Sequence, residues 1–118
     1  MRRDMNSDSA TLPGLPADEN VPLSRVLLRL GELETELRRR GVRHLTVFGS
    51  VARGEAGPNS DIDLIAELDP GADIDIFDWV SISVLISDHI GHPIDIVRRQ
   101  KLRPEVAAAA ARDEIHAF

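Results

Sequence analysis

The amino-acid sequence predicts an α/β fold in which a small mixed β-sheet is packed by helices on one face. Two observations predict it: apolar residues recur at helical spacing near the start and the middle of the chain, and short β-prone runs separate these helices. At 118 residues, the chain has about the length of one domain. The expected order is helix, strand, turn, strand, helix, strand, helix.

Residues 1–20 are predicted to be a flexible tail, because they carry Ser7, Ser9, Pro13, Gly14 and Pro16 and hardly show periodic apolar content. Residues 21–118 are predicted to form a single domain. The domain begins with an amphipathic helix that has Pro22 in its first turn, Arg38 to Arg40 in its last turn and Gly41 as its stop. The apolar positions at helical spacing are Leu23, Val26, Leu27, Leu30, Leu33 and Leu37.

Two short strands are expected next. Leu45 to Phe48 is β-prone and ends at Gly49, and a single helical turn fits before the chain is broken by further turn residues. Asp61 to Glu67 then alternates, so Asp61 and Asp63 share one face and the intervening apolar residues share the other.

The remaining elements are a helix, a strand and a last helix. The helix is expected from about Ile76 to Ile90, with Gly91 as its stop. In the strand from Pro93 to Val97, Asp95 faces away from its two isoleucine neighbours. The last helix should start near Pro104 and include Ala107 to Ala111, whose small side chains would allow close packing. The helix from about Ile76 to Ile90 is expected to bury Trp79, Ile82 and Leu85 or Ile86.

Composition narrows the classes of function. A net charge of −6 argues against a protein that grips the phosphate backbone of bulk nucleic acid. Zero cysteines leave neither a disulfide framework nor a thiolate zinc site. We expect no signal peptide, because Arg2 and Arg3 lack a following apolar h-region, and no membrane span, because no apolar run reaches about 18 residues. A cytoplasmic protein is therefore expected.

Three aspartates carry the candidate chemistry. Asp61 and Asp63 lie two apart on one strand, so their Cα atoms are about 6.5 to 7 Å apart with both side chains on one face. Asp95 is expected on the same open side of the sheet, because its strand alternates in the same way. Carboxylates suit Mg²⁺, and a third acid beside a pair permits two-metal phosphoryl chemistry. These three residues are the candidate metal ligands and catalytic residues.

The turn after the first strand is the candidate phosphate site. Gly49 lets the backbone approach a ligand closely, and Ser50 opens a helical turn whose free N–H groups suit the anionic oxygens of a triphosphate. Arg53 either contacts phosphate or braces the loop against Glu55 or Asp61, and the sequence leaves both interpretations open. A covalent role for Ser50 is disfavoured, because no His or Lys has a motif-level reason to activate it.

Other polar residues receive structural interpretations. Asp73 and Asp75 repeat the letters of the Asp61 motif, yet they follow a turn and precede a helix, where acids cap the N-terminus. The histidines show no metal-ligand spacing and are expected to have surface or packing roles. They are His44, His89, His92 and His116.

The run from Gly49 to Glu55, followed by Ser60 to Leu64 and later by Asp95, resembles the minimal nucleotidyltransferases of the DNA polymerase beta-like superfamily. That family has Gly-Ser, ten residues, then Asp-x-Asp, and the spacing is intact here. The resemblance spans about Leu23 to Phe118 and implies the polymerase beta-like nucleotidyltransferase fold.

The resemblance also implies roles. Asp61 and Asp63 would bind the Mg²⁺ ions that carry the nucleoside triphosphate, and Asp95 would bind the second metal and act as base toward an acceptor hydroxyl. Gly49 and Ser50 would hold the phosphates. Many relatives of this size are antitoxins that silence a HEPN-domain ribonuclease toxin by transferring AMP from ATP onto a toxin tyrosine.

The expected function is therefore Mg²⁺-dependent transfer of AMP from ATP to a hydroxyl, namely a tyrosine hydroxyl of a cognate HEPN toxin. Because the chain has no room for an acceptor domain, a second subunit or a partner should complete the cleft, and a homo-oligomer is compatible with this. Two alternatives stay open at this point. One is a non-catalytic antitoxin that acts by occlusion, and the other is a small-molecule nucleotidyltransferase of the aminoglycoside-modifying kind.

Overall fold

The computed structural model describes residues 22–57 and 59–118, so the predicted tail over 1–20 lies outside the described residues. Its sheet has the strand order β4-β3-β2-β5. The strands are β2 (Val42–Phe48), β3 (Ile62–Leu68), β4 (Ile94–Arg98) and β5 (Ile115–His116). β2 pairs antiparallel with β3 and β5, whereas β3 and β4 are parallel. The predicted mixed sheet is confirmed.

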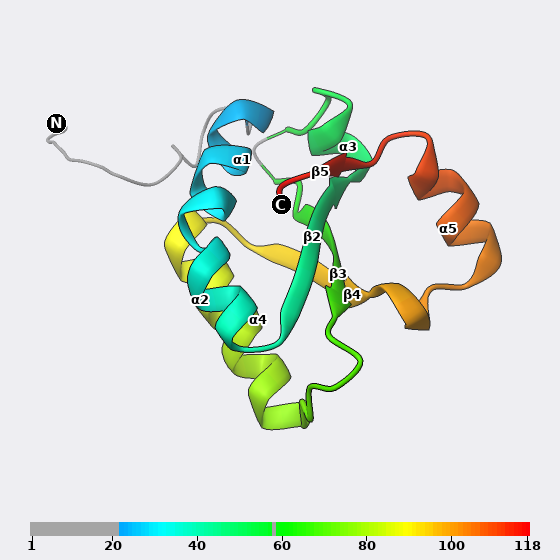
Figure 1. Cartoon of the computed structure of the whole chain (residues 1–118). Coiled ribbons are helices and arrows are strands. Elements are labelled where there is room, and N and C mark those ends of the chain that lie inside the picture. Colours follow the sequence, from blue (N-terminus) through cyan, green and yellow to red (C-terminus); the bar gives the residue numbers. More distant parts are fainter. Residues whose placement is uncertain (1–21, 58) are drawn as a thin grey trace, which may run out of the picture.

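Helices α1 (Leu23–Glu32), α2 (Glu34–Arg39) and α4 (Ile76–Ile90) pack on one face of this sheet (Figure 1). The sequence predicted one helix where the structure has α1 and α2, which are separated at Leu33. Gly31 lies just before the break, and glycine weakens a helix interior by about 1 kcal/mol relative to alanine. Over the described residues, no helix is long and apolar enough to cross a bilayer.

A cluster of aliphatic side chains fills the space between these helices and the sheet. Side chains alternate along a strand, so the residues between the core positions of β3 and β4 face the other side of the sheet. Asp63 and Asp95 are among them. The fully buried core members include Val26, Leu30, Leu37, Leu45, Val47, Ile62, Leu64, Ile82, Ile86 and Ile90.

α4 has the predicted bounds. Its N-cap is Asp75, whose carboxylate accepts a hydrogen bond from the Asp78 N–H at 2.8 Å, and the Asp78 carboxylate accepts one from the Asp75 N–H at 3.2 Å. This reciprocal capping box confirms the structural interpretation of Asp75. Gly91 ends the helix with φ +78°, a left-handed conformation that favours glycine. Ile82 and Ile86 are buried, whereas Trp79 and Leu85 are only partly so.

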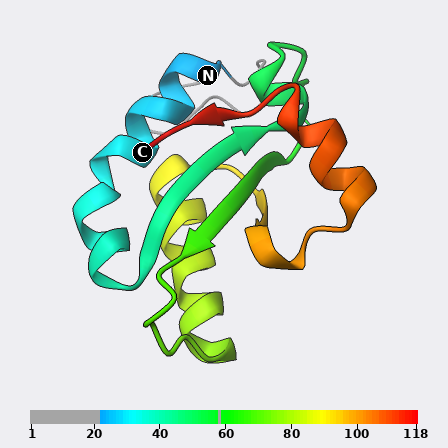
Figure 2. The ribbon, with the colours of Figure 1, turned by 45° about the vertical axis from the view of Figure 1, so that its right-hand side comes forward.

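The C-terminal part crosses to the other side of the sheet (Figure 2). It contains a 3-10 turn η1 (Arg99–Lys101), α5 (Pro104–Ala111) and β5. The expected close packing of the α5 alanines is wrong, because only Ala110 among the five is buried. Ion pairs tie this part to the rest, with Arg53 contacting Asp113 at 2.9 Å. The sequence did not predict β5, which has two residues and pairs with the distant β2.

Candidate active site

The turn that ends β2 contacts the first residues of β3. Phe48 is extended, and Gly49 then turns the chain with φ +74° into the short helix α3 (Gly49–Ala52). A Cβ atom on Gly49 would overlap Oδ2 of Asp63 and lie 3.2 Å from its Cγ. Gly49 is thus required both by its left-handed backbone and by its contact with a carboxylate.

The parallel register of β3 and β4 places Asp63 directly beside Asp95 on the same face. Neighbouring strands lie about 4.8 Å apart, so both carboxylates can reach one ligand. Asp61 precedes β3 and is exposed. We call Asp61, Asp63 and Asp95 the carboxylate cluster. The structure brings these residues to one end of the sheet, beside Gly49.

The electrostatics of the cluster are dominated by negative charge. Burial raises the pKa of Asp63 above its ordinary value, the charges of Asp95 and Asp61 raise it further, and Arg53 partly opposes the rise. The protein therefore does not supply enough positive charge at this point to neutralise the carboxylates. A divalent cation with a preference for oxygen ligands would neutralise them.

The donor set fits such a cation, although the side chains are not already closed around one point. Among residues 22–57 and 59–118, no three His, Cys, Asp or Glu side chains form a ready-made metal site. Asp61 and Asp95 are exposed and free to change rotamer, and like charges favour separation in the absence of a counter-charge. Binding one ion by all three carboxylates thus requires side-chain rotation, with the backbone positions already in place.

His92 connects the two segments that carry the cluster, a role that the sequence did not reveal. Its ring is buried, and its Nε2 donates a hydrogen bond to the Ser60 carbonyl at 2.6 Å. The carbonyl of Pro93 accepts a hydrogen bond from the Ile62 N–H at 3.1 Å. Asp61 therefore lies between two contacts to the segment that begins β4. The one sequence feature that could have suggested this structural role for His92 is its position three residues before Asp95.

Arg53 braces the loop, as one of the two sequence interpretations expected. Its Nε donates to Oε1 of Glu55 at 2.8 Å, and its Nη1 donates to Oδ2 of Asp113 at 2.9 Å. Asp113 was not predicted as a partner, because it lies 60 residues away in sequence. The Arg53 side chain is 43% exposed, and ion pairs at such exposure add little to stability because solvent screens them. They can therefore be exchanged for a phosphate contact.

A cavity of about 290 Å³ lies between this turn and α5. This cavity is lined by Gly49 and Arg53, two of the residues predicted to bind phosphate, and by Phe48. The opposite wall comes from α5, which the sequence suggested only as a packing element. The remaining residues that line the cavity are Glu105, Val106, Ala109 and Ala110 of α5 and Asp113 just after it.

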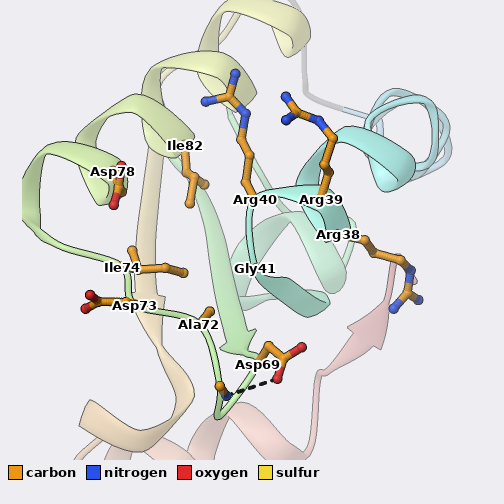
Figure 3. A pocket seen from close by; sticks show the side chains of 11 residues that line it. Arg38, Arg39, Arg40, Gly41, Asp69, Ala72, Asp73, Ile74, Asp78 and Ile82 are labelled. Atoms are coloured by element: carbon orange, nitrogen blue, oxygen red, sulfur yellow. Dashed lines mark hydrogen bonds between the residues drawn. The ribbon is translucent and has the colours of Figure 1, made fainter.

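A second cavity, of about 570 Å³, lies at the other end of the sheet, away from the carboxylate cluster (Figure 3). Arg38, Arg39 and Arg40 line it, but all three pair with acids of α2. Hydrogen bonds from Arg39 and Arg40 lower the pKa of Glu36 to about 2. In Figure 3, Asp69 at its lower edge accepts a hydrogen bond from the neighbouring Gly71 N–H. The cavity contains none of the predicted site residues.

Comparison with known proteins agrees with this fold. The protein adenylyltransferase MntA of Thermococcus cleftensis is 29% identical, over 76% of this chain and 97% of that protein. A solved structure described as a candidate minimal nucleotidyltransferase superimposes with a TM-score of 0.69 at 29% identity, covering 80% of this chain and 95% of the other. The resemblance to minimal nucleotidyltransferases is thereby confirmed.

A structure of a toxin–antitoxin pair with AMP-PNP has a TM-score of 0.62 at 16% identity, covering 78% of this chain and 72% of the other chain, and shows a shared fold. The family model described as the nucleotidyltransferase domain matches residues 30–115. That match includes the Gly49 turn and the whole carboxylate cluster. The chain therefore belongs to the nucleotidyltransferase domain family.

Proposed function

We propose that this nucleotidyltransferase uses Mg²⁺ and ATP to transfer AMP to a tyrosine hydroxyl of a HEPN-domain ribonuclease toxin, and so acts as an antitoxin in the cytoplasm. The observation that carries the proposal is the register of Asp63 beside Asp95, with Asp61 just before β3 and the Gly49 turn against Asp63. The name of the Thermococcus cleftensis relative, a protein adenylyltransferase, supports the nature of the transferred group and of the acceptor.

In this proposal the carboxylate cluster holds Mg²⁺, which supplies charge stabilisation for the attacking and leaving oxygens. The backbone of Gly49 and Ser50 binds the triphosphate, and Arg53 exchanges its carboxylate partners for a phosphate oxygen. The cavity against α5 receives the nucleoside. Asp95 accepts the proton of the acceptor hydroxyl. The acceptor oxygen then bonds to the α-phosphorus, the bond from that phosphorus to the bridging oxygen breaks, and pyrophosphate leaves.

A protein acceptor is supported by size and charge. The described residues form one small sheet with its helices, which leaves no separate acceptor-binding domain among them. The net charge of −6 disfavours bulk nucleic acid. The chain contains no tyrosine, so it cannot be its own tyrosine acceptor.

The test is a transfer assay with labelled ATP, Mg²⁺ and the protein encoded by the neighbouring gene, which the proposal expects to be a HEPN-domain toxin. We expect the label on that protein, with a mass increase of one or more AMP groups. The Asp61→Asn, Asp63→Asn double variant should transfer nothing and should fail to neutralise the toxin. No transfer by the wild type with both proteins folded contradicts the proposal, and neutralisation by the double variant would favour the occlusion mechanism.

A further inference from the structure

α4 is apolar on two sides, and the structure covers only one of them. Ile82, Ile86 and Ile90 face the core and are buried. A second row of large apolar side chains is exposed, with 80% exposure for Phe77. A helix that is apolar all round is normally covered all round. The exposed row, called the α4 stripe, consists of Ile76 (64% exposed), Phe77, Val80 (52%) and Val84 (52%).

The spacing of the stripe makes it one continuous surface. Ile76, Val80 and Val84 follow each other at intervals of four residues, and Phe77 lies three residues before Val80, so all of them line one side of the helix. In both ribbon views, the N-terminal half of α4 extends beyond the strands (Figures 1 and 2). The sheet therefore does not reach the first turn of α4.

Neighbouring helices occupy the other flank of α4. Nη1 of Arg40 donates to Oγ of Ser81 at 3.0 Å, and the ring of His89 contacts Glu32 at 2.8 Å. α1 and α2 thus lie along the side of α4 that carries these two residues. The stripe lies on the side that they leave open, and large exposed apolar patches of this kind mark interaction surfaces.

The charges around the stripe indicate what can cover it. The segment Ile76–Ile90 contains no Lys or Arg, and its exposed Asp88 continues the stripe four residues after Val84. Asp78, in contrast, lines the cavity of Arg39 and Arg40 on another side of the helix. Two copies of this chain would each bring a net charge of −6 and no Lys or Arg of α4 to the interface. Like charges at a closing interface are unfavourable. A second copy is therefore a poor occupant, and a partner with basic side chains is a good one.

We propose that the α4 stripe docks an apolar helix face flanked by Lys or Arg on the protein that receives the AMP group. This inference rests on the proposed function and adds the surface by which the acceptor protein is recognised. The stripe starts at the sheet end opposite to the carboxylate cluster, and α4 is about 22 Å long at 1.5 Å per residue. Docking there holds the acceptor protein without contacting the reacting atoms.

This separation gives the experiment its readout. Removing the stripe should raise KM for the whole toxin and leave kcat unchanged, because the contacts are equally strong in the ground state and the transition state. A short peptide that contains only the acceptor tyrosine lacks the docking helix, so its modification should not change. Asp63→Asn should instead abolish transfer to both acceptors.

The test variant is the pair Phe77→Ser, Val84→Ser, and its matched control is Leu28→Ser on α1, which removes another large apolar side chain that is 59% exposed. For the pair, we expect toxin affinity by calorimetry to fall at least about tenfold, as for hot-spot anchors, with KM rising in parallel. Asp88→Lys should weaken binding several-fold, and more at low salt than at high salt. Leu28→Ser should bind as the wild type does.

Three outcomes would overturn the inference. The first is unchanged affinity and KM in the Phe77, Val84 pair while the wild type still transfers AMP, which would leave the proposed function standing. The second is a wild-type dimer in sedimentation that this pair converts to monomer, because the stripe would then bind a second copy. The third is equal loss in Leu28→Ser. Absence of transfer by the wild type to either acceptor would instead reject the proposed function itself.

Discussion

The backbone of Gly49 lies directly against the carboxylate of Asp63, so that any Cβ at position 49 would overlap Oδ2. Glycine is therefore required here by a neighbour on another strand as well as by its own φ of +74°. The close approach fixes the Gly49 turn relative to the carboxylate cluster. Because a single added methyl group would disrupt this contact, the substitution Gly49→Ala tests it.

Gly49→Ala is expected to abolish transfer and to lower the free energy of unfolding by more than the roughly 1–2 kcal/mol cost of a left-handed alanine. The matched control is Gly54→Ala, because Gly54 has nearly the same φ of +73° but no atom within 4 Å of its added Cβ. The control should lose only that backbone cost and keep its AMP transfer. Equal loss of activity in the two variants would contradict a specific contact between position 49 and Asp63.

Asp63→Asn is expected to raise stability at neutral pH without divalent cations, and so to raise Tm. The pKa of Asp63 is raised in the folded state by burial, Asp95 and Asp61. Between the ordinary pKa and this raised one, the folded protein binds more protons than the unfolded chain, so stability falls as pH rises through that window. The variant should lack this fall, measured by thermal unfolding from about pH 4 to 7. Asp88→Asn, at an exposed position on α4, should retain it.

With Mg²⁺ and nucleotide bound, the wild type is expected to become more stable than the variants that lack Asp63. Addition of Mg²⁺ with a non-hydrolysable ATP analogue should stabilise the wild type by about 2.7 kcal/mol at a hundred times Kd, because only the folded state binds them. Asp61→Asn, Asp63→Asn should show little of this gain, and EDTA should remove it from the wild type. A wild-type Tm that is insensitive to Mg²⁺ and nucleotide would contradict a metal role for the carboxylate cluster.

His92→Leu is expected to lose about 1–3 kcal/mol of stability, because the part-buried Ser60 carbonyl loses its donor. It should also lower kcat more than it changes KM, since Asp61 follows Ser60 directly. His92→Gln keeps a donor and should recover part of kcat. His116→Gln, at an exposed position, serves as the control. A kcat equal to wild type in the destabilised but folded leucine variant would restrict His92 to a packing role.

Variants of Arg53 and of its partner Asp113 can distinguish phosphate binding by Arg53 from bracing of the loop. If Arg53 binds phosphate during the reaction, Arg53→Ala should raise KM for ATP about tenfold or more, the effect of losing a charge-assisted contact of about 1.5–3 kcal/mol. Asp113→Asn removes one brace and should leave KM for ATP unchanged or lower it, because Arg53 is then freer to reach the phosphate. Matching increases in both variants would indicate that the brace alone matters.

Much of the fold could be predicted because its signals are local. The bounds of α4 follow from apolar spacing between Asp75, which caps the first turn, and Gly91, which supplies the left-handed end. Asp61 and Asp63 must share a face because a strand alternates, whatever surrounds it. The interruption at Leu33 was missed, since a 3.6-residue apolar period continues across it and the pattern cannot register a local change of hydrogen bonding.

Contacts between distant segments could not be predicted in this way. Nothing in the letters near Asp113 indicates an ion pair with Arg53, and nothing near His92 indicates a hydrogen bond to Ser60. The two residues of β5 are too few to carry a periodic signal, and their pairing with β2 depends on the path of α5. Each of these contacts joins segments whose separation is set by the packing of the whole chain.

By itself, the sequence determined the types of chemical group and their local geometry: a glycine able to turn, a serine after it, and acids alternating on short strands. Only the tertiary structure decided that Asp95 pairs with Asp63 rather than with a neighbouring residue of β3, and that Gly49 contacts the same carboxylate. The physical reason is that steric preferences and periodicity act over a few residues. Strand register, in contrast, is selected by the burial of apolar side chains contributed from the entire chain.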